Sequence, residues 1–273
     1  MHFKTIQGVE VPEIGLGTHR LIGREGENTI KLALNLGYRH IDTAQSYKNE
    51  REVGEAIKRS HVDREEIFLT TKIWHTHLDK KDVLKVAENS LKELDTPYVD
   101  LLLVHWPNPE VDIEKTMEAF LSLRDQGKAL NIGVANYPLS KLKELNEELA
   151  APIFCNQVEY HPYLGQLDLL DYAAEHDLLF TAYSPLAQGK VIDDPLLKEM
   201  GEKYGKSAVQ IALRWLIEQE QVVAIPKAST EEHLKENIDI YDFALEDDDF
   251  YAIDDLEKST RLVDPDFAPD WDK

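Results

Sequence analysis

The sequence predicts an α/β protein: a (β/α)8 TIM barrel with a short amino-terminal β-hairpin and extra helices late in the chain. First, apolar strand runs such as VDLLLV and VVAI are continuous rather than alternating, which indicates burial on both faces of a parallel sheet. Second, strand and helix patterns alternate along the chain without a linker or a change in composition. Third, the strand-like segments number about eight, the count at which such a sheet closes into a barrel.

An open, doubly wound sheet is the alternative fold. Such a sheet normally carries a glycine-rich turn after its first strand. The nearest match, Gly15-Leu-Gly17, lacks the third glycine and precedes no immediate helix. We therefore predict the closed barrel, as a single domain over residues 1–273.

The elements are expected in the following order. A hairpin and a first strand occupy the first 20 residues, with Gly8, Pro12, Gly15 and Gly17 as turn residues. Further strands are expected at 40–44, 67–74, 99–106, 131–136, 154–159, 179–184 and 222–225. Helices are expected at 28–36, 50–59, 81–94, 113–126, 140–149, 167–176, 208–219, 231–238 and 247–256. A longer connection that includes residues 195–204 precedes helix 208–219, and an irregular tail ends the chain.

Composition narrows the class of partner and the compartment. The chain has 30 basic and 52 acidic residues and a net charge of −22, which argues against nucleic acid or an anionic membrane surface as a partner. No apolar run is long enough for a signal peptide or a membrane span. The single cysteine, Cys155, cannot form an internal disulfide, which fits a reducing cytosol. We expect a cytoplasmic protein; whether its acidic surface reflects a salt-adapted host stays open.

Polar side chains stand at the carboxyl ends of the expected strands. Asp42, Lys72 and His105 fall at or near the ends of the second, third and fourth strands, and Tyr47 follows Asp42 by five residues. The active site of a parallel barrel forms at this end, so the four side chains are expected to meet. Each alone could be a satisfied buried polar group, but together they favour a proton-transfer site. Later strands end in Asn136, Gln157 and Glu159, Tyr183 and Ser184, and Lys227.

The four residue types suit reduction of a carbonyl. A tyrosine has a reference pKa of about 10, and a neighbouring ammonium is expected to lower it. Lys72 would be that ammonium, Asp42 would hold it in place, and Tyr47 would donate a proton to an oxygen becoming an alkoxide. His105 would orient the carbonyl through a hydrogen bond. Because none of the four is a good nucleophile, hydride from a bound cofactor is the fitting reductant.

The sequence resembles the aldo-keto reductases. The motifs run from about residue 3 to residue 245 in the family's order: GYRHIDTAQSYKNEREVGEAI, TTKIW, LLLVHWP, GVANY, NQVEYHP, AYSPLAQG and IPKAS. The resemblance implies a barrel enzyme that reduces aldehydes and ketones with NADPH, acting on a small carbonyl substrate as a monomer. It places the family's four catalytic residues on Asp42, Tyr47, Lys72 and His105, the same set reached above.

The resemblance also implies a cofactor site. Asn136 and Gln157 would bind the nicotinamide amide, and Tyr183 would stack beneath the ring. The remaining positions that would line the cofactor are Thr18, Asp42, Ser184, Leu186, Gln188, Ile225, Lys227, Ser229, Thr230, His233, Glu236 and Asn237. Ala135 and Ala228 stand where the family usually has serine, and the change at Ala135 removes one hydrogen bond to the amide.

His233 is the most informative departure from the family, because an arginine usually lies there against the 2′-phosphate and adenine. Arginine forks onto phosphate and stays charged, whereas histidine is mostly neutral at pH 7. We therefore predict a weakened preference for NADPH, with NADH also used. Lys227, the hydroxyls of Ser229 and Thr230, and the helix amino terminus after them would still assist phosphate binding.

Trp74 and Trp106, with Tyr47 and His105, are expected to line an aromatic, mostly apolar substrate pocket. The tail after residue 256 is short beside the long carboxyl-terminal loop of many animal members. It resembles the bacterial and archaeal branch, which includes reductases of diketogluconate, methylglyoxal and β-keto esters. A shorter lid predicts a more open and less selective pocket, and the natural substrate stays open.

Two other functions compete with the reductase. His75 and His77, with His105 and Asp42, could hold a metal ion in a barrel hydrolase. Such a pair normally lies on the first strand, and this one lies in a loop past Trp74, so we expect no metal site. The second alternative is a cofactor-sensing binding module, a role that some family members play beside a channel. The four site residues and the lack of an added interaction segment favour the enzyme.

Overall fold

The computed structural model describes residues 2–271. A two-stranded antiparallel hairpin comes first, formed by β1 (Phe3–Ile6) and β2 (Val9–Pro12). The eight strands that follow pair in parallel, each with its neighbour in the sequence. They are β3 (Leu16–Gly17), β4 (His40–Asp42), β5 (Phe68–Ile73), β6 (Val99–Val104), β7 (Ala129–Ala135), β8 (Cys155–Glu159), β9 (Leu179–Tyr183) and β10 (Val222–Ala224).

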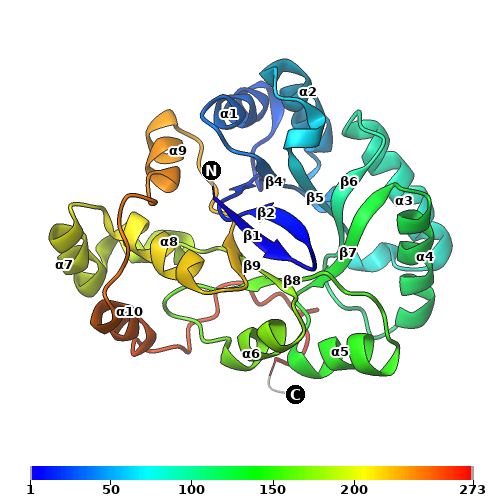
Figure 1. The fold of residues 1–273 in the computed structure, drawn as a ribbon. Helices are drawn as coiled ribbons and strands as arrows, with labels where there is room; N and C mark the ends of the chain where they lie inside the picture. Colours follow the sequence, from blue (N-terminus) through cyan, green and yellow to red (C-terminus); the bar gives the residue numbers. More distant parts are fainter. Residues whose placement is uncertain (1, 272–273) are drawn as a thin grey trace.

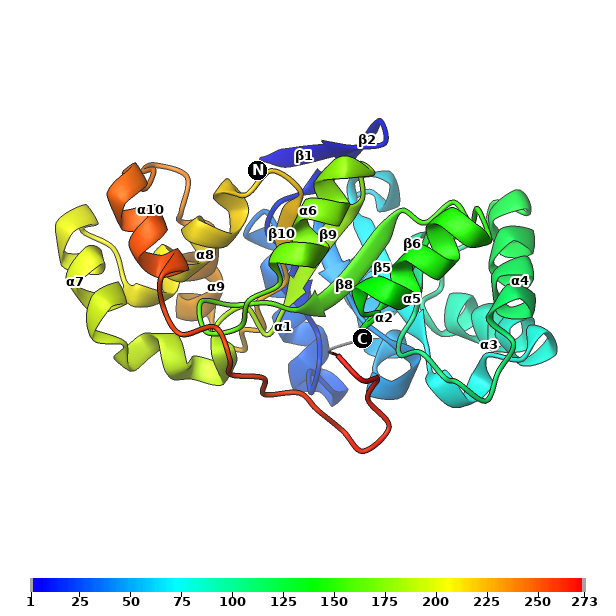
Figure 2. The ribbon, with the colours of Figure 1, turned by 90° about the horizontal axis from the view of Figure 1, so that it is seen from below.

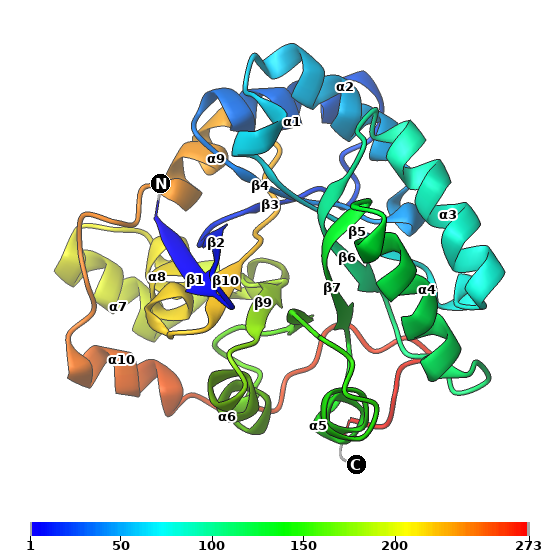
Figure 3. The ribbon, with the colours of Figure 1, turned by 45° about the vertical axis from the view of Figure 1, so that its right-hand side comes forward.

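Helices cover the outside of the sheet (Figure 1). They are α1 (Gly23–Asn35), α2 (Glu50–Ser60), α3 (Lys80–Glu93), α4 (Ile113–Asp125), α5 (Leu139–Lys143), α6 (Leu167–Glu175), α7 (Pro195–Tyr204), α8 (Ala208–Glu218), α9 (Glu231–Ile238) and α10 (Asp247–Asp254). Near the end of the chain, α9 packs against α1, so the helical layer meets its own beginning (Figure 3).

Backbone hydrogen bonds between the first and last strands close the sheet. Gly15 N donates to Ala224 O at 2.9 Å, and Gly17 N donates to Pro226 O at 3.1 Å. A Cβ atom at Gly17 would lie 2.7 Å from Ile225 O, so the seam needs glycine at this position. The prediction of a (β/α)8 TIM barrel with an amino-terminal hairpin is confirmed, and the open-sheet alternative is wrong.

The core has an inner and an outer part, separated by the strands. Leu101 and Leu103 of β6 belong to a cluster inside the barrel, which also contains Ile6 and Val11 of the hairpin. Leu102, between them, faces the helices and belongs to the larger outer cluster. The hairpin therefore closes one end of the barrel, and the carboxyl-terminal tail lies at the other end (Figure 2). This leaves the carboxyl ends of the strands as the open face.

Residues 195–204, expected as part of a connection, form helix α7, and two further elements differ from their expected form. Helix α1 begins at Gly23, five residues before the expected start, because the Glu52 carboxylate accepts a hydrogen bond from Gly23 N at 2.8 Å. That partner lies on another helix and leaves no local pattern. The expected helix at 140–149 is α5 followed by a π-helical turn, Glu144–Glu148.

Asp100, an acid within apolar β6, is satisfied by partners on the neighbouring segments. Its Oδ2 atom accepts from Arg64 Nη2 at 2.7 Å and from Leu69 N at 3.0 Å. Leu69 lies near the start of β5, so this pair ties the strands at the end remote from the open face. Across residues 2–271, no helix has both the length and the apolarity to cross a membrane.

The buried thiol of Cys155 gives a first testable prediction. Cys155 lies inside the barrel with no exposed surface, and burial raises the pKa of the thiol to about 12. Because the thiolate is the reactive form, we expect the native protein to show no reaction with a chromogenic disulfide reagent at pH 8 over an hour. One thiol should react after unfolding in guanidinium; prompt reaction of the native protein would contradict the burial.

Candidate active site

The acid, the amine and the phenol predicted from the sequence meet at the open face. Asp42 ends β4, Lys72 lies near the end of β5, and Tyr47 lies in a 3₁₀ turn, Gln45–Tyr47, that follows β4. Lys72 Nζ donates to Asp42 Oδ1 at 2.5 Å, and it lies 5.2 Å from the centroid of the Tyr47 ring. Asp42 and Lys72 are each 1 % exposed, so the ion pair is held away from water.

The pKa of Tyr47 corrects one expectation. Burial raises the pKa of the phenol above its ordinary value, and this outweighs the opposite effect of the Lys72 ammonium. For Lys72, burial favours the neutral amine, but the Asp42 carboxylate and Tyr47 together raise the pKa of the ammonium. Tyr47 is therefore protonated and Lys72 charged at neutral pH. The phenol is a proton donor beside a fixed positive charge, as its predicted role requires.

His105 follows β6 and completes the set. Its ring lies in edge contact with Tyr47, at 5.7 Å between centroids, and with Trp74, at 5.2 Å. Burial, assisted by the Lys72 charge, lowers the pKa of His105 well below its ordinary value, so the imidazole is neutral at pH 7. Its Nδ1 atom lies 3.4 Å from the hydroxyl of Ser46. A neutral imidazole at this place can donate a hydrogen bond to a carbonyl without carrying charge.

Three residues expected around a nicotinamide are hydrogen-bonded into the same set. Asn136 Nδ2 donates to the His105 carbonyl at 2.9 Å, and the Tyr183 hydroxyl donates to Asn136 Oδ1 at 2.8 Å. Gln157 Nε2 donates to Asp42 Oδ2 at 2.8 Å. Since a carboxylate only accepts, this bond fixes the orientation of the Gln157 amide and leaves its oxygen for another donor. The sequence did not indicate that Gln157 touches Asp42.

A cleft of about 1240 Å³ lies between α7, α8, α9 and the loop that follows β9. The expected cofactor residues that line it are Ser184, Leu186, Gln188, Lys227, His233, Glu236 and Asn237. Lys198 and Lys206 also line it and were missed, but they pair with Asp193 and with Asp239 and Asp242 respectively. Within residues 2–271, Lys227 is the lysine of this cleft that no carboxylate neutralises. It can therefore receive an anionic group.

The other expected cofactor residues lie around this cleft or beneath it. The Thr18 hydroxyl donates to Asp42 O at 2.9 Å, and Ile225 is buried at the barrel seam. Ser229 is exposed, and Thr230 is the N-cap of α9, where its hydroxyl accepts from His233 N at 3.3 Å. The amino terminus of α9, a favourable place for phosphate, thus follows directly after Lys227 and Ser229.

Aromatic rings form the other side of the open face, and the tail contributes one of them. Phe267 stacks on His75, at 4.2 Å between centroids, and makes edge contacts with Trp74 at 5.5 Å and Trp106 at 5.6 Å. Trp271 also contacts Trp106, at 6.1 Å. The tail is short, yet its rings pack over the expected substrate residues, and the more open, less selective pocket stays a prediction. No periodic pattern marks Phe267 in the sequence.

His19, another residue missed from the sequence, follows Thr18 at the end of the β3 segment. Its ring lies 5.0 Å from that of Tyr47. Burial, together with the charges of Arg20, Lys72 and Lys227, lowers the pKa of His19. It adds an imidazole, neutral at pH 7, to the edge of the site.

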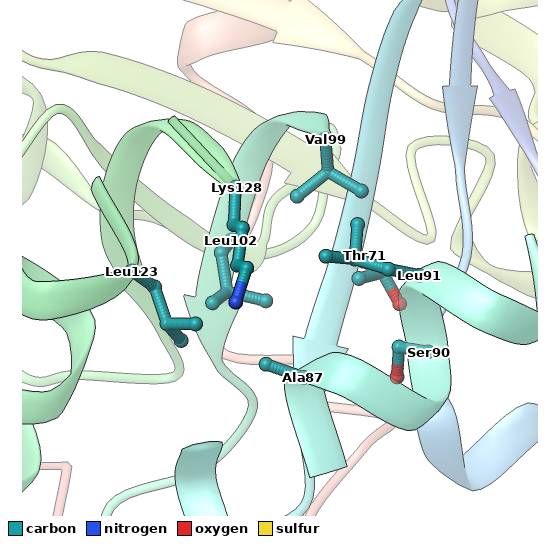
Figure 4. Close-up of a pocket in the computed structure, with 8 residues that line it drawn as sticks. All are labelled: Thr71, Ala87, Ser90, Leu91, Val99, Leu102, Leu123 and Lys128. Atoms are coloured by element: carbon teal, nitrogen blue, oxygen red, sulfur yellow. The ribbon is translucent and has the colours of Figure 1, made fainter. Parts of the chain in front are cut away.

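A small cavity behind the strands is distinct from this site. It has a volume of about 10 Å³ and lies between β5, β6 and helices α3 and α4, with Thr71, Ser90 and Leu102 among its lining residues (Figure 4). This is room for one water molecule at most. The Lys128 side chain beside it forms an ion pair with Glu88. The cavity is a packing gap and holds no substrate.

The two histidines considered as metal ligands have other contacts. His77 Nδ1 lies 3.1 Å from the side-chain amide nitrogen of Gln45, and His75 stacks on Phe267. Among the residues that the structure describes, no three His, Cys, Asp or Glu side chains are placed to bind one metal ion.

The fold and the site together define a barrel enzyme whose open face carries a buried ion pair, a phenol and a neutral imidazole. The sequence model of the Aldo/keto reductase family matches residues 13–258. The chain belongs to this family, and it is an NAD(P)H-dependent oxidoreductase that reduces carbonyl groups. Membership of this family argues against the alternative of a metal-dependent hydrolase, in which His75 and His77 would bind a metal ion.

Similar proteins come from several bacteria. The glyoxal reductase of Bacillus subtilis is 41% identical over 260 residues, which cover 95% of this chain and 94% of that protein. The methylglyoxal reductase DkgA of Escherichia coli is 39% identical over 267 residues, which cover 96% of each chain. Among crystal structures, an aldo-keto reductase enzyme from a Medee basin deep-sea metagenome library aligns with a TM-score of 0.92. It is 38% identical, and the alignment covers 96% of this chain and 98% of that one.

Proposed function

We propose that the protein reduces small aldehydes and dicarbonyls to alcohols with NADPH, and that Tyr47 is the general acid. The observation that carries the proposal is the geometry of one phenol: Tyr47 lies beside the Lys72 ammonium, which is locked to Asp42 at 2.5 Å, and in edge contact with neutral His105. A protonated phenol next to a fixed cation can give up its proton as negative charge develops on a substrate oxygen. Relatives that act on glyoxal and methylglyoxal support the substrate class.

The side chains of this site have separate tasks. His105 is a neutral donor that orients the carbonyl oxygen toward Tyr47. Lys72 stabilises the phenolate that remains after proton transfer, and Asp42 holds Lys72 in place. Trp74, Trp106 and Phe267 exclude water from the substrate.

The described residues fit a nicotinamide dinucleotide. The Gln157 amide oxygen is free to accept from a carboxamide, because its nitrogen is committed to Asp42. Asn136 holds the Tyr183 hydroxyl, which fixes the ring expected beneath the nicotinamide. Lys227 and the amino terminus of α9 supply a cation and backbone donors for phosphate. When bound there, the reduced cofactor supplies the hydride.

Steady-state assays test the proposal. The loss of the reduced nicotinamide absorbance should be followed with methylglyoxal, phenylglyoxal, simple aldehydes and keto esters, each with NADPH and with NADH. We expect turnover with dicarbonyls and a preference for NADPH. Cofactor binding without turnover of any carbonyl would contradict the proposal and favour a cofactor-sensing role.

Substitution of His233 tests the cofactor preference. His233 lines the cleft near Lys227 and is exposed, so an arginine can enter without repacking the core. We expect His233→Arg to raise the ratio of NADPH to NADH affinity roughly tenfold, because a guanidinium adds charge-assisted hydrogen bonds to a 2′-phosphate. His176→Arg, an equally exposed change at the end of α6, is the matched control and should leave the ratio unchanged. An unchanged ratio in His233→Arg would refute the prediction.

The pH profile tests the charge state of His105. Because its pKa is well below the ordinary value, the imidazole should stay neutral as the pH falls from 8 to 6. We therefore expect no loss of kcat/KM over this range from protonation of His105. A fall in kcat/KM centred near pH 6.5 that disappears in His105→Asn would contradict this prediction.

A further inference from the structure

Glu159, the last residue of β8, is a buried acid with an unusual set of partners. The side chain has no exposed surface. Its Oε1 atom accepts from Leu262 N at 2.9 Å, and its Oε2 atom accepts from Val263 N at 2.9 Å. Both donors belong to the carboxyl-terminal tail, 103 and 104 residues further along the chain. A side chain from the barrel wall thus holds two successive backbone groups of the tail.

His161 provides the third hydrogen bond to the Glu159 carboxylate. Its Nδ1 atom accepts from Tyr163 N at 3.2 Å, so the ring proton lies on Nε2, which is 3.0 Å from Glu159 Oε1. The ring is therefore a neutral donor, and Glu159 acts as a charged acceptor with three donors. Bonds of this kind are stronger than neutral ones, and losing the acceptor leaves buried donors unsatisfied.

A backbone hydrogen bond also holds the tail just before Leu262, whereas ring contacts hold it after Val263. Thr260 N donates to Tyr163 O at 2.8 Å. After Val263 the tail meets the barrel through rings, with Phe267 against Trp74, His75 and Trp106. Glu159 is the buried carboxylate that holds the tail at the two residues just before this aromatic segment. The position of Phe267 over the substrate face therefore depends on where Glu159 holds residues 262 and 263.

We propose that Glu159 is a positioning residue that fixes the tail, so that Phe267 forms a wall of the substrate pocket for carbonyls with a flat apolar substituent. The wall is built from one residue of the tail rather than from the barrel, and the buried carboxylate on β8 sets its place. This inference rests on the proposed function for its substrate class. The ring of an aryl dicarbonyl would lie against Phe267, Trp74 and Trp106, while a methyl group would not reach them.

Glu159→Gln tests this proposal, because the amide keeps the size of the side chain but offers only one oxygen to the two tail donors. We expect KM for phenylglyoxal to rise about tenfold, the value for loss of one such bond, while kcat and KM for methylglyoxal and the Kd of NADPH change less than twofold. Phe267→Ala should give the same selective rise. The double variant should be no worse than either single variant, because both remove one wall.

Matched controls separate positioning from general stability. Asp100→Asn makes the same change in a half-buried strand carboxylate at the remote end of the barrel, and Phe3→Ala removes an exposed ring from the hairpin. Both should leave the KM of phenylglyoxal unchanged. Equal effects of Glu159→Gln on both substrates, a weakened NADPH affinity, or additive effects in the double variant would overturn the proposal.

Limited trypsin digestion gives a readout that needs no activity. The bond between Arg261 and Leu262 is shielded in the wild type because Leu262 N is bonded to Glu159. We expect cleavage there at least tenfold faster in Glu159→Gln, and at the wild-type rate in Asp100→Asn. Unchanged cleavage would overturn the inference. If the wild type reduces no carbonyl but the cleavage result holds, the proposed function fails while the role of Glu159 in holding the tail stands.

Discussion

Tyr47→Phe should lower kcat for methylglyoxal by roughly a thousandfold, within the range that a general acid contributes. The substitution removes one hydroxyl group from a half-buried ring and keeps the ring contacts with His19 and His105. The hydroxyl is protonated at neutral pH because burial raises its pKa, and it is the proposed source of the proton. Steady-state assays at saturating NADPH measure the effect.

Cofactor affinity is the control for this variant. The lining of the cleft between α7, α8 and α9, the proposed NADPH site, does not include Tyr47, so the Kd of NADPH should change less than twofold. Tyr163→Phe removes a hydroxyl that donates to Asp194 at 2.9 Å, away from the four side chains of the site, and should retain turnover. A kcat in Tyr47→Phe within tenfold of the wild type would contradict the assignment of the acid.

Lys72→Met should produce the second large effect, a loss of both activity and stability. Activity should fall at least a hundredfold, because the phenolate left on Tyr47 after proton transfer loses its ammonium partner. Stability should fall by about 3–5 kcal/mol, because Asp42 is left as a buried charge whose main partner is gone. Kinetics and urea unfolding of the same preparation measure the two effects.

The double variant Asp42→Asn/Lys72→Met separates the two losses. Removing both charges eliminates the unpaired carboxylate, so most of the lost free energy of unfolding should return. Activity should stay low, since Tyr47 still lacks its cation. Recovery of activity along with stability would show that Lys72 acts only by supporting the fold.

The barrel could be predicted from the sequence because its signals are local. Continuous apolar runs mark strands buried on both sides, and Gly37, the residue after the expected helix 28–36, is a residue type that commonly ends helices. The convergence of Asp42, Lys72 and His105 followed from topology alone, since parallel strands bring their carboxyl ends to one face. The direction of the Tyr47 pKa did not follow, because it depends on how burial balances against one ammonium.

The parts that the sequence did not reveal are long-range contacts. Phe267 reaches the open face from a tail that Glu159 holds at residues 262 and 263, and the two residues lie in segments with no shared pattern. Glu159, an acid in the apolar strand β8, stands out in the sequence, but neither the periodicity nor the spacing of residues indicates its hydrogen-bond partners. The bond between Gln157 and Asp42 joins residues 115 positions apart and is equally invisible in the chain.

The most direct test of the central claim is a single-turnover measurement. Wild-type protein and Tyr47→Phe, each preloaded with NADPH, should be mixed rapidly with methylglyoxal while the reduced nicotinamide absorbance is followed. The proposed role of Tyr47 predicts a rapid loss of absorbance, equal in amount to the bound cofactor, in the wild type. It predicts a rate roughly a thousandfold slower in the variant at equal occupancy. Equal rates in the two proteins would contradict it.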